Sequence, residues 1–278
     1  MTDEGNRKRE ESLRVFSQAA TTYDRIGPGI FSYFGQRLVD LAEIKADGNV
    51  LDVATGRGAL LFPAAAKVGA NGHVTGIDFS PDMVRETAKE IESRKLNHFE
   101  IRQMDAEQMT FSDESFDHVL CRFALWMFSE PARVLEEFYR VLKPGGRTAI
   151  STWAASNQTW CNEVLRPYAP APVSKAEIKK DETRFDTPLQ LETALQAAGF
   201  SDIQITSEDK DFVYASEDHY WQSLWSTGIR RQLEKMNPAV LDQAKSDVMR
   251  KLQATKNADG FHKINFALFA FGTKAAQS

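Results

Sequence analysis

Two aspartates and a glycine-rich turn are the residues of this chain whose types and spacing could support chemistry. Asp52 ends an apolar run, Gly56 and Gly58 follow it in a small-residue turn, and an alanine-rich stretch over 59–68 comes next. A strand that feeds a helix through such a turn points backbone N–H groups and the helix N-terminus at a ligand. Asp78 ends a second apolar run, 20 residues beyond Gly58, where a carboxylate suits the two hydroxyls of a ribose. Together the two acids predict a nucleoside-bearing ligand with a positively charged end.

Alternating strands and helices must position these acids. Five apolar runs read as strands: 49–53, 73–77, 99–103, 116–121 and 147–152. Three helical stretches lie between them: 58–68, 81–94 and 131–142. This alternation predicts an α/β fold with a doubly wound, mostly parallel sheet, in which ligands sit at the carboxyl ends of the strands. Asp105 and Arg122 fall at or just past predicted strand ends, so one crevice would contain both of them and the two acids.

The rest of the chain predicts a lid and a cap around this core. We expect a disordered tail over 1–11, two N-terminal helices at 13–23 and 30–44, a helix at 189–198, and strand pieces at 202–206, 211–214 and 263–273. The domain plan is a cofactor-binding core with its lid over 12–155, a cap over 156–184 and 217–257, and the remainder of a seven-stranded sheet over 185–215 and 258–273.

Composition narrows the classes of protein that the chain can be. The net charge of −5 argues against a nucleic-acid partner gripped through phosphates. The two cysteines signal no disulfide framework, and the five histidines lack metal-ligand spacing, so we expect no metal. There is neither a signal peptide nor an apolar stretch of about 20 residues that could span a membrane. We therefore expect a cytoplasmic protein, with a homodimer as a candidate assembly.

Five short motifs occur in order along the chain. They are Asp52-x-x-x-Gly56-x-Gly58, Gly76-Ile77-Asp78-Phe79-Ser80, Met104-Asp105-Ala106-Glu107, Ser115-Phe116-Asp117-His118-Val119-Leu120, and Tyr139-Arg140-Val141-Leu142-Lys143-Pro144-Gly145-Gly146. In this order and at this spacing, they resemble the motifs of class I S-adenosylmethionine-dependent methyltransferases, in the branch that includes the ubiquinone and menaquinone C-methyltransferases. The resemblance covers roughly residues 12–155, with a weaker match at 185–215 and 263–273. It implies S-adenosylmethionine as cofactor and S-adenosylhomocysteine as product.

The resemblance assigns the methionine part of the cofactor to the first motif. The loop of Ala54, Gly56 and Gly58 would pass under it, although Ala54 stands where the family usually has glycine. Asp52 would hold the amino group, directly or through water. Arg122 would lie beside the carboxylate.

The second and third motifs are assigned the nucleoside part. Asp78 would accept both ribose hydroxyls, which suits a carboxylate. Phe79 and Met83 would sandwich the adenine between an aromatic ring and a thioether. Asp105 would accept a hydrogen bond from the adenine amine, and the Ala106 amide would donate to the ring.

The lid and the cap are expected to close the site. Tyr23 resembles the N-terminal tyrosine that closes over the cofactor in this branch, and His219 is the histidine best placed for a general base. Because methyl transfer is a direct displacement, neither is required as an acid or base unless the acceptor must lose a proton. An aromatic acceptor pocket is expected from five residues: Phe31, Trp126, Trp153, Tyr220 and Trp221.

The identity of the acceptor stays open at this point. Quinone methyltransferases carry an Arg-Asn pair where this chain has Trp126 and Met127, which favours a small, partly apolar or aromatic acceptor instead. Two other functions are kept. The spacing Ala54-x-Gly56-x-x-Ala59 imitates a dinucleotide fingerprint and allows a nicotinamide-dependent oxidoreductase. The third function is a relative of the methyltransferases that binds cofactor without methylating.

Overall fold

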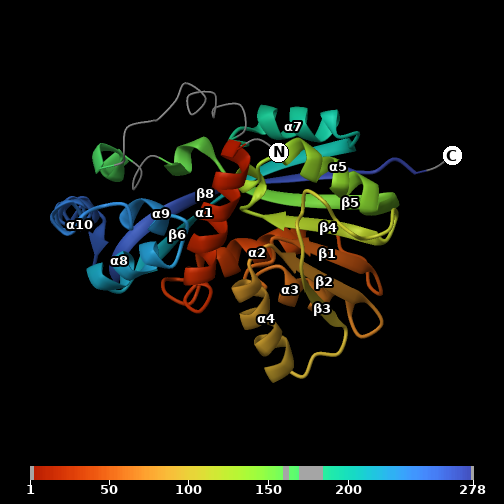
Figure 1. Ribbon diagram of the computed structural model, residues 1–278, viewed down its shortest axis with the longest axis horizontal. Helices are drawn as coiled ribbons and strands as arrows, with labels where there is room; N and C mark the ends of the chain where they lie inside the picture. Colours follow the sequence, from red (N-terminus) through yellow and green to blue (C-terminus); the bar gives the residue numbers. More distant parts are fainter. Residues whose placement is uncertain (1–2, 159–162, 169–183, 277–278) are drawn as a thin grey trace.

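The computed structural model describes residues 3–158, 163–168 and 184–276, and its centre is one mixed sheet (Figure 1). The strands are β1 Asn49–Val53, β2 His73–Asp78, β3 Phe99–Gln103, β4 Phe116–Arg122, β5 Leu142–Trp153, β6 Ser201–Tyr214, β7 Lys256–Asn257 and β8 Gly260–Thr273. Their order is β3-β2-β1-β4-β5-β8-β6, and the two-residue β7 pairs with β8. The first five strands of this order run parallel, while β8 is antiparallel to both β5 and β6. The predicted doubly wound, mostly parallel fold is confirmed.

Helices cover both faces of this sheet and also form the cap. They are α1 Asp3–Ala19, α2 Ile30–Leu41, α3 Leu61–Val68, α4 Pro81–Ser93, α5 Pro131–Val141, α7 Pro188–Ala197, α8 Glu217–Trp225, α9 Arg230–Leu233 and α10 Pro238–Gln253. On one face, Phe34 of α2 and Leu61 of α3 are fully buried in a common core. On the other, Phe138 of α5 and Leu195 of α7 belong to a second core. These apolar helix faces hold the strand ends in place beneath the site.

Helix α4 starts where the sequence indicates. The Ser80 hydroxyl accepts a hydrogen bond from the Met83 N–H at 3.3 Å, and Pro81 occupies the first helical position. A side-chain cap of this kind is worth about 1 kcal/mol. The start matters because residues 78–83 connect the acid at the end of β2 to the first turn of α4.

The expected disordered tail over 1–11 is wrong for residues 3–11, because α1 begins at Asp3. Arg9 pairs with Asp105, and Glu11 pairs with Lys235 of the cap at 2.6 Å. Figure 1 shows α1 standing between the sheet and the cap helices, in contact with both parts. The helix is ordered by charged partners far away in the sequence, which local composition does not reveal.

The cap is built on extensions of the sheet. The expected strand pieces at 202–206 and 211–214 are one strand, β6, which runs with β8 from the core into the cap (Figure 1). The segment 217–257, expected to be helical, forms α8, α9 and α10 and ends in β7. Tyr220, Leu224, Val248 and Phe261 are buried together in a core of the cap. Much of the expected cap segment 156–184 lies outside the described residues.

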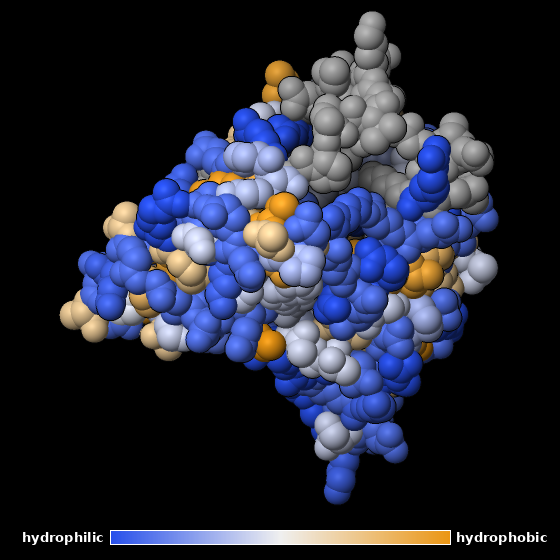
Figure 2. Space-filling view, turned by 60° about the vertical axis from the view of Figure 1, so that its left-hand side comes forward, coloured by the Kyte–Doolittle hydropathy of each residue, from blue (hydrophilic) through white to orange (hydrophobic). Residues whose placement is uncertain are grey.

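The surface of this assembly is mainly hydrophilic on the face drawn in Figure 2, where hydrophobic residues lie in separate spots. Among the described residues, the exposed large hydrophobic side chains are Phe79, Leu189 and Ile264. None of the helices in the described ranges is both long and apolar enough to cross a membrane.

Candidate functional site

A cavity lies at the carboxyl ends of β1, β2 and β4, roofed by α1. We call it the cofactor cavity. Nine of the eleven predicted cofactor residues line it: Tyr23, Ala54, Gly56, Asp78, Phe79, Met83, Asp105, Ala106 and Arg122. Residues from α1 that the sequence analysis did not select also line it: Arg9, Ser12, Leu13 and Phe16. The predicted strand ends thus come together in one crevice.

The turn after β1 depends on left-handed backbone conformations. Ala54, Gly56 and Gly58 have φ values of 56°, 52° and 78°. An alanine in this region costs roughly 1–2 kcal/mol, which a glycine avoids. Gly58 does not line the cavity; a Cβ built there would lie 2.6 Å from the ring of Phe62. Glycine is therefore needed at position 58 so that α3 can pack against the turn, and not for contact with a ligand.

Asp78 joins this turn to the end of β2. One carboxylate oxygen accepts a hydrogen bond from the Gly56 N–H at 2.8 Å, and the other accepts from the Ser80 N–H at 2.9 Å. Burial raises the pKa of this carboxyl, and these amide bonds oppose the shift. Each oxygen retains a further acceptor position, which is what two vicinal hydroxyls require.

A flat slot follows Asp78. Phe79 is 39% exposed, whereas Met83 is buried, and both line the cavity. Asp105 lies beside them and accepts a hydrogen bond from the Glu107 N–H at 3.0 Å. Arg9 of α1 enters this slot: it is ion-paired with Asp105, and its guanidinium carbon lies 4.7 Å from the centroid of the Phe79 ring. Arg9 belongs to none of the five motifs, so no pattern in the sequence indicates it.

Arg122 supplies a buried positive charge at the other end of the cavity. It is 6% exposed, and its Nη1 has no hydrogen-bond partner within the described part of the chain. Its guanidinium carbon lies 4.9 Å from the Phe31 ring centroid. Burial raises the pKa of the Tyr23 hydroxyl, and the positive charge of Arg122, together with a hydrogen bond to it, opposes this rise. A buried guanidinium with an unused N–H is suited to bind a carboxylate.

Asp52 departs from its expected place. It is 1% exposed, does not line the cavity, and accepts a hydrogen bond from the Thr55 hydroxyl at 2.6 Å. Its other oxygen lacks a hydrogen-bond partner among the residues described. Burial raises the pKa of this carboxyl to about 7. The role that the structure shows for Asp52 is therefore to stabilise the turn, through its hydrogen bond with Thr55, from the side away from the cavity.

A second cavity, of about 460 Å³, adjoins the first and is called the acceptor cavity. Four residues line both: Phe16, Tyr23, Phe123 and Met127. Its aromatic wall includes three of the predicted pocket residues: Phe31, Trp126 and Trp153. Stacked pairs build this wall, with ring centroids 3.8 Å apart for Phe123 and Trp153 and 5.0 Å apart for Tyr23 and Phe31.

Two of the predicted pocket residues lie elsewhere. Tyr220 is fully buried in the core of the cap, and Trp221 packs edge-on against Trp225 with centroids 6.5 Å apart. Neither lines the acceptor cavity. The one-turn spacing of the two tryptophans reflects the packing of α8 within the cap, so aromatic content alone misled the prediction.

His219 is not placed as a general base. Its Nε2 accepts a hydrogen bond from the Gly27 N–H at 3.0 Å, and the residue lines neither cavity. The lone pair that would take a proton is thus occupied by a backbone amide. The other weak candidate, Tyr23, lines both cavities.

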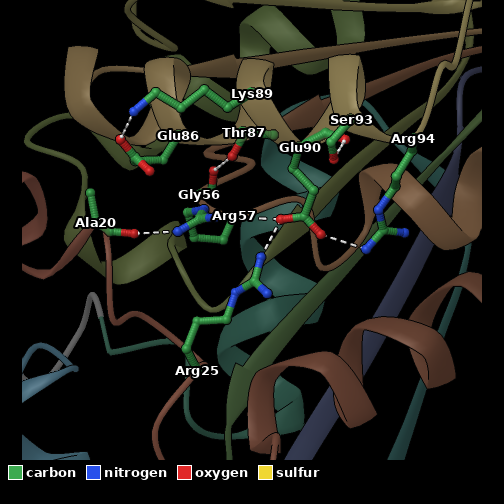
Figure 3. A network of polar contacts seen from close by, with 10 residues as sticks. All are labelled: Ala20, Arg25, Gly56, Arg57, Glu86, Thr87, Lys89, Glu90, Ser93 and Arg94. Carbon is green, nitrogen blue, oxygen red and sulfur yellow. Dashed lines mark hydrogen bonds and ion pairs between the residues drawn. The ribbon is translucent and has the colours of Figure 1, made fainter.

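A polar network fastens the N-terminal segment to the glycine turn (Figure 3). Arg57 donates to the Ala20 carbonyl at 2.6 Å and pairs with Glu90 of α4 at 3.3 Å. Arg25 also pairs with Glu90, and the Thr87 hydroxyl donates to the Gly56 carbonyl at 2.7 Å. The chain that leads from α1 to Tyr23 is therefore held against the floor of the cavity.

Comparison with known proteins identifies the family. A model of the family described as "Methyltransferase domain" matches residues 44–211. This chain belongs to that methyltransferase family. It is 31% identical over 252 residues to the nocamycin O-methyltransferase of Saccharothrix syringae, which covers 86% of this chain and 90% of the relative. It is an S-adenosylmethionine-dependent methyltransferase, and the nicotinamide-dependent alternative is not supported.

Two further similarities concern a protein sequence and a solved structure. The aklanonic acid methyltransferase DauC of Streptomyces sp. strain C5 is 39% identical over 144 residues, which are 52% of this chain and 66%, just under two thirds, of that protein. The solved structure of Haemonchus contortus phosphoethanolamine N-methyltransferase 2 with S-adenosyl-L-methionine has a TM-score of 0.54 and 21% identity, covering 90% of this chain and 54% of that one. At this identity the structural likeness supports the fold alone.

Proposed function

We propose that this methyltransferase binds S-adenosylmethionine in the cofactor cavity and methylates a small, partly apolar or aromatic acceptor held in the acceptor cavity. The observation that carries this proposal is the junction of the two cavities, at which Phe16, Tyr23, Phe123 and Met127 line both. A donor in one and an acceptor in the other would meet at this junction.

The residues of the cofactor cavity fit the proposed cofactor. The unused N–H of Arg122 would bind the methionine carboxylate, and Asp78 would accept the ribose hydroxyls. Phe79 and Met83 would enclose the adenine, with Asp105 and the Ala106 amide at its edge. Asp52, which lies behind the turn, would reach the amino group only through an intervening water. These assignments place the carboxylate of the ligand beside a guanidinium and its ribose hydroxyls beside a carboxylate.

The chain's part in the reaction is positioning and exclusion of water. The bound cofactor supplies an electrophilic methyl group, and direct displacement needs that group and the nucleophile in line within a dry site. Tyr23, stacked on Phe31, and the Phe123–Trp153 pair would orient the acceptor. His219 is hydrogen-bonded to the Gly27 N–H, and no histidine occurs among the described residues that line the two cavities. This favours an acceptor whose nucleophilic atom is already deprotonated at neutral pH.

Four finer aspects of the proposal rest on the sequence and the relatives. The two curated relatives are named for aklanonic acid and nocamycin, which supports a small organic acceptor. The net charge of −5 supports a protein that does not take nucleic acid as its partner. Action in the cytoplasm and assembly as a homodimer remain predictions.

The test is calorimetric titration of S-adenosylmethionine and S-adenosylhomocysteine into the purified protein. We expect micromolar binding that Asp78→Ala weakens about tenfold or more, since hydrogen bonds to a charged group are lost. Asp40→Ala is the matched control, because Asp40 of α2 pairs with Lys67 of α3 at 3.0 Å and lines neither cavity. Absence of binding, or equal affinities for the wild type and Asp78→Ala, would contradict the proposal.

A further inference from the structure

The acceptor cavity has a second wall whose chemistry differs from that of its aromatic wall. This polar wall comes from the cap and from β8 and contains seven residues: Arg184, Ser223, Thr227, Arg231, Gln232, Lys263 and Asn265. None of these seven lines the cofactor cavity. The polar wall is therefore available to the acceptor and is not needed for the cofactor.

The polar wall carries three cationic side chains. Arg184, Arg231 and Lys263 line the cavity, and no aspartate or glutamate occurs among its described lining residues. Glu11 of α1 lies 3.6 Å from Arg231 but is bound more closely by Lys235, at 2.6 Å. The lining of the cofactor cavity is mixed, with the acids Asp78, Asp105 and Glu107 and the arginines Arg9 and Arg122. The whole chain has a net charge of −5, so this group of cations differs in sign from the chain as a whole.

Two amides in the same wall have unused hydrogen-bonding capacity. Asn265 of β8 is 3% exposed, and its Oδ1 has no hydrogen-bond partner among the residues that the structure describes. The buried Oε1 of Gln232, on α9, is in the same situation. A buried polar atom without a partner costs roughly 1–3 kcal/mol, so a ligand that supplies a donor gains by binding there.

We infer that the acceptor is an aromatic anion: a ring system that carries a carboxylate or an ionised enol or phenol, together with a hydroxyl or N–H donor. The aromatic wall takes the rings, the cations of the polar wall take the negative charge, and the two amides take the donor. This inference deepens the proposed function and rests on it only for the transfer step; the charge preference of the cavity stands by itself.

The charge preference can be measured without knowing the natural acceptor. Three probes share one ring system and differ in charge at pH 7.5: 2-naphthoate, 2-naphthol and 2-naphthylmethylammonium. Calorimetric titration of each is carried out with and without saturating S-adenosylhomocysteine, which cannot donate a methyl group. We expect 2-naphthoate to bind about tenfold more tightly than the ammonium probe, with 2-naphthol between them.

Variants locate the preference in the polar wall. Lys263→Met and, separately, Arg184→Gln are each expected to weaken 2-naphthoate several-fold while 2-naphthol changes less than twofold, because only the anion loses a charged partner. Lys245→Met removes a cation of the cap outside the cavity, where Lys245 faces Trp221 and Asp218, and should change nothing. Arg184 is exposed, so its substitution stays informative if Lys263→Met compromises folding.

Either of two results overturns the inference. The first is that the three probes bind with comparable affinities, or that none of them binds saturably. The second is a preference for 2-naphthoate that neither Lys263→Met nor Arg184→Gln reduces. Failure of the proposed function is a separate result, read from S-adenosylhomocysteine itself. If S-adenosylhomocysteine does not bind but 2-naphthoate remains preferred, the cavity is anion-selective and the methyl-transfer role is wrong.

Discussion

At the scale of single residues, Arg9 makes the contacts that the adenine of the cofactor would make. It lies over the Phe79 ring and pairs with Asp105. Binding of adenine must therefore displace this side chain, and the free energy lost with the broken contacts weakens the binding of the cofactor. We predict that Arg9→Ala lowers the dissociation constant of S-adenosylhomocysteine about threefold to fivefold, as expected for a partly exposed ion pair.

Calorimetry on wild type, Arg9→Ala and Arg7→Ala would check this prediction. Arg7 is an exposed residue of α1 that does not line the cavity, so its substitution controls for a change in helix charge. Weaker binding by Arg9→Ala would show instead that Arg9 remains in place and stacks on the bound cofactor.

The carboxyl of Asp52 gives a prediction about pH. Burial raises its pKa in the folded protein to about 7, from 3.8. Between these values the folded state holds a proton that the unfolded state has lost, so this group makes stability fall as pH rises through the window. Asp52→Asn keeps an acceptor for the Thr55 hydroxyl but does not titrate.

We therefore expect the melting temperature of Asp52→Asn, relative to the wild type, to rise between pH 5 and pH 8. Thermal unfolding of both proteins at four pH values across this range measures the difference. Curves that stay parallel would mean that Asp52 is ionised in the folded protein throughout.

At the scale of elements, the attachment of the N-terminal segment depends on one acid of α4. Glu90 accepts from Arg25 and Arg57, which hold residues 20–25 against the glycine turn (Figure 3). We predict that Glu90→Gln speeds amide hydrogen exchange over residues 12–29 but lowers global stability by only about 1 kcal/mol, because the amide oxygen of glutamine still accepts a hydrogen bond while the charge is lost.

Glu86→Gln is the control for this element. Glu86 sits one turn earlier on α4 and pairs with Lys89 of the same helix at 2.8 Å (Figure 3). Mass-spectrometric exchange of both variants should separate them. If Glu86→Gln has the same effect as Glu90→Gln, the faster exchange comes from the loss of a charge on α4 and not from the loss of the contacts to Arg25 and Arg57.

How far the sequence predicted these elements depends on where their determinants lie. Strands β1 to β4 and helices α4 and α5 were predicted within one or two residues, because apolar periodicity, Ser80-Pro81 and similar local signals set their limits. The order of α1 depends on ion pairs such as Arg9–Asp105, across 96 positions of sequence. Likewise, whether an aromatic such as Tyr220 enters a cavity is decided by packing, which spacing does not encode.

At the scale of the whole molecule, core and cap are joined by continuous strands. The pairing of β6 with β8 extends from Ser201–Thr273 in the core to Tyr214–Phe261 in the cap. Helix α1 adds contacts to both sides, through Arg9 to Asp105 and through Arg14 to Glu234 at 2.5 Å. The acceptor cavity lies between these parts, so its shape depends on their fixed relation. The two parts should consequently unfold as one unit.

We predict a single unfolding transition that a substitution in the cap shifts as a whole. Phe261 is 5% exposed in the core of the cap, and Phe261→Ala should cost about 3–5 kcal/mol, which lowers the melting temperature by roughly 10 °C for a chain of this size. Far-ultraviolet circular dichroism reports mainly the helices and strands of the core, while tryptophan fluorescence reports Trp221 and Trp225 of the cap and Trp126 and Trp153 of the acceptor cavity. Because β6 and β8 belong to both parts, the two signals should shift together. An early fluorescence transition that precedes most of the loss of dichroism would show that the cap melts alone, and that the acceptor cavity is formed only part of the time.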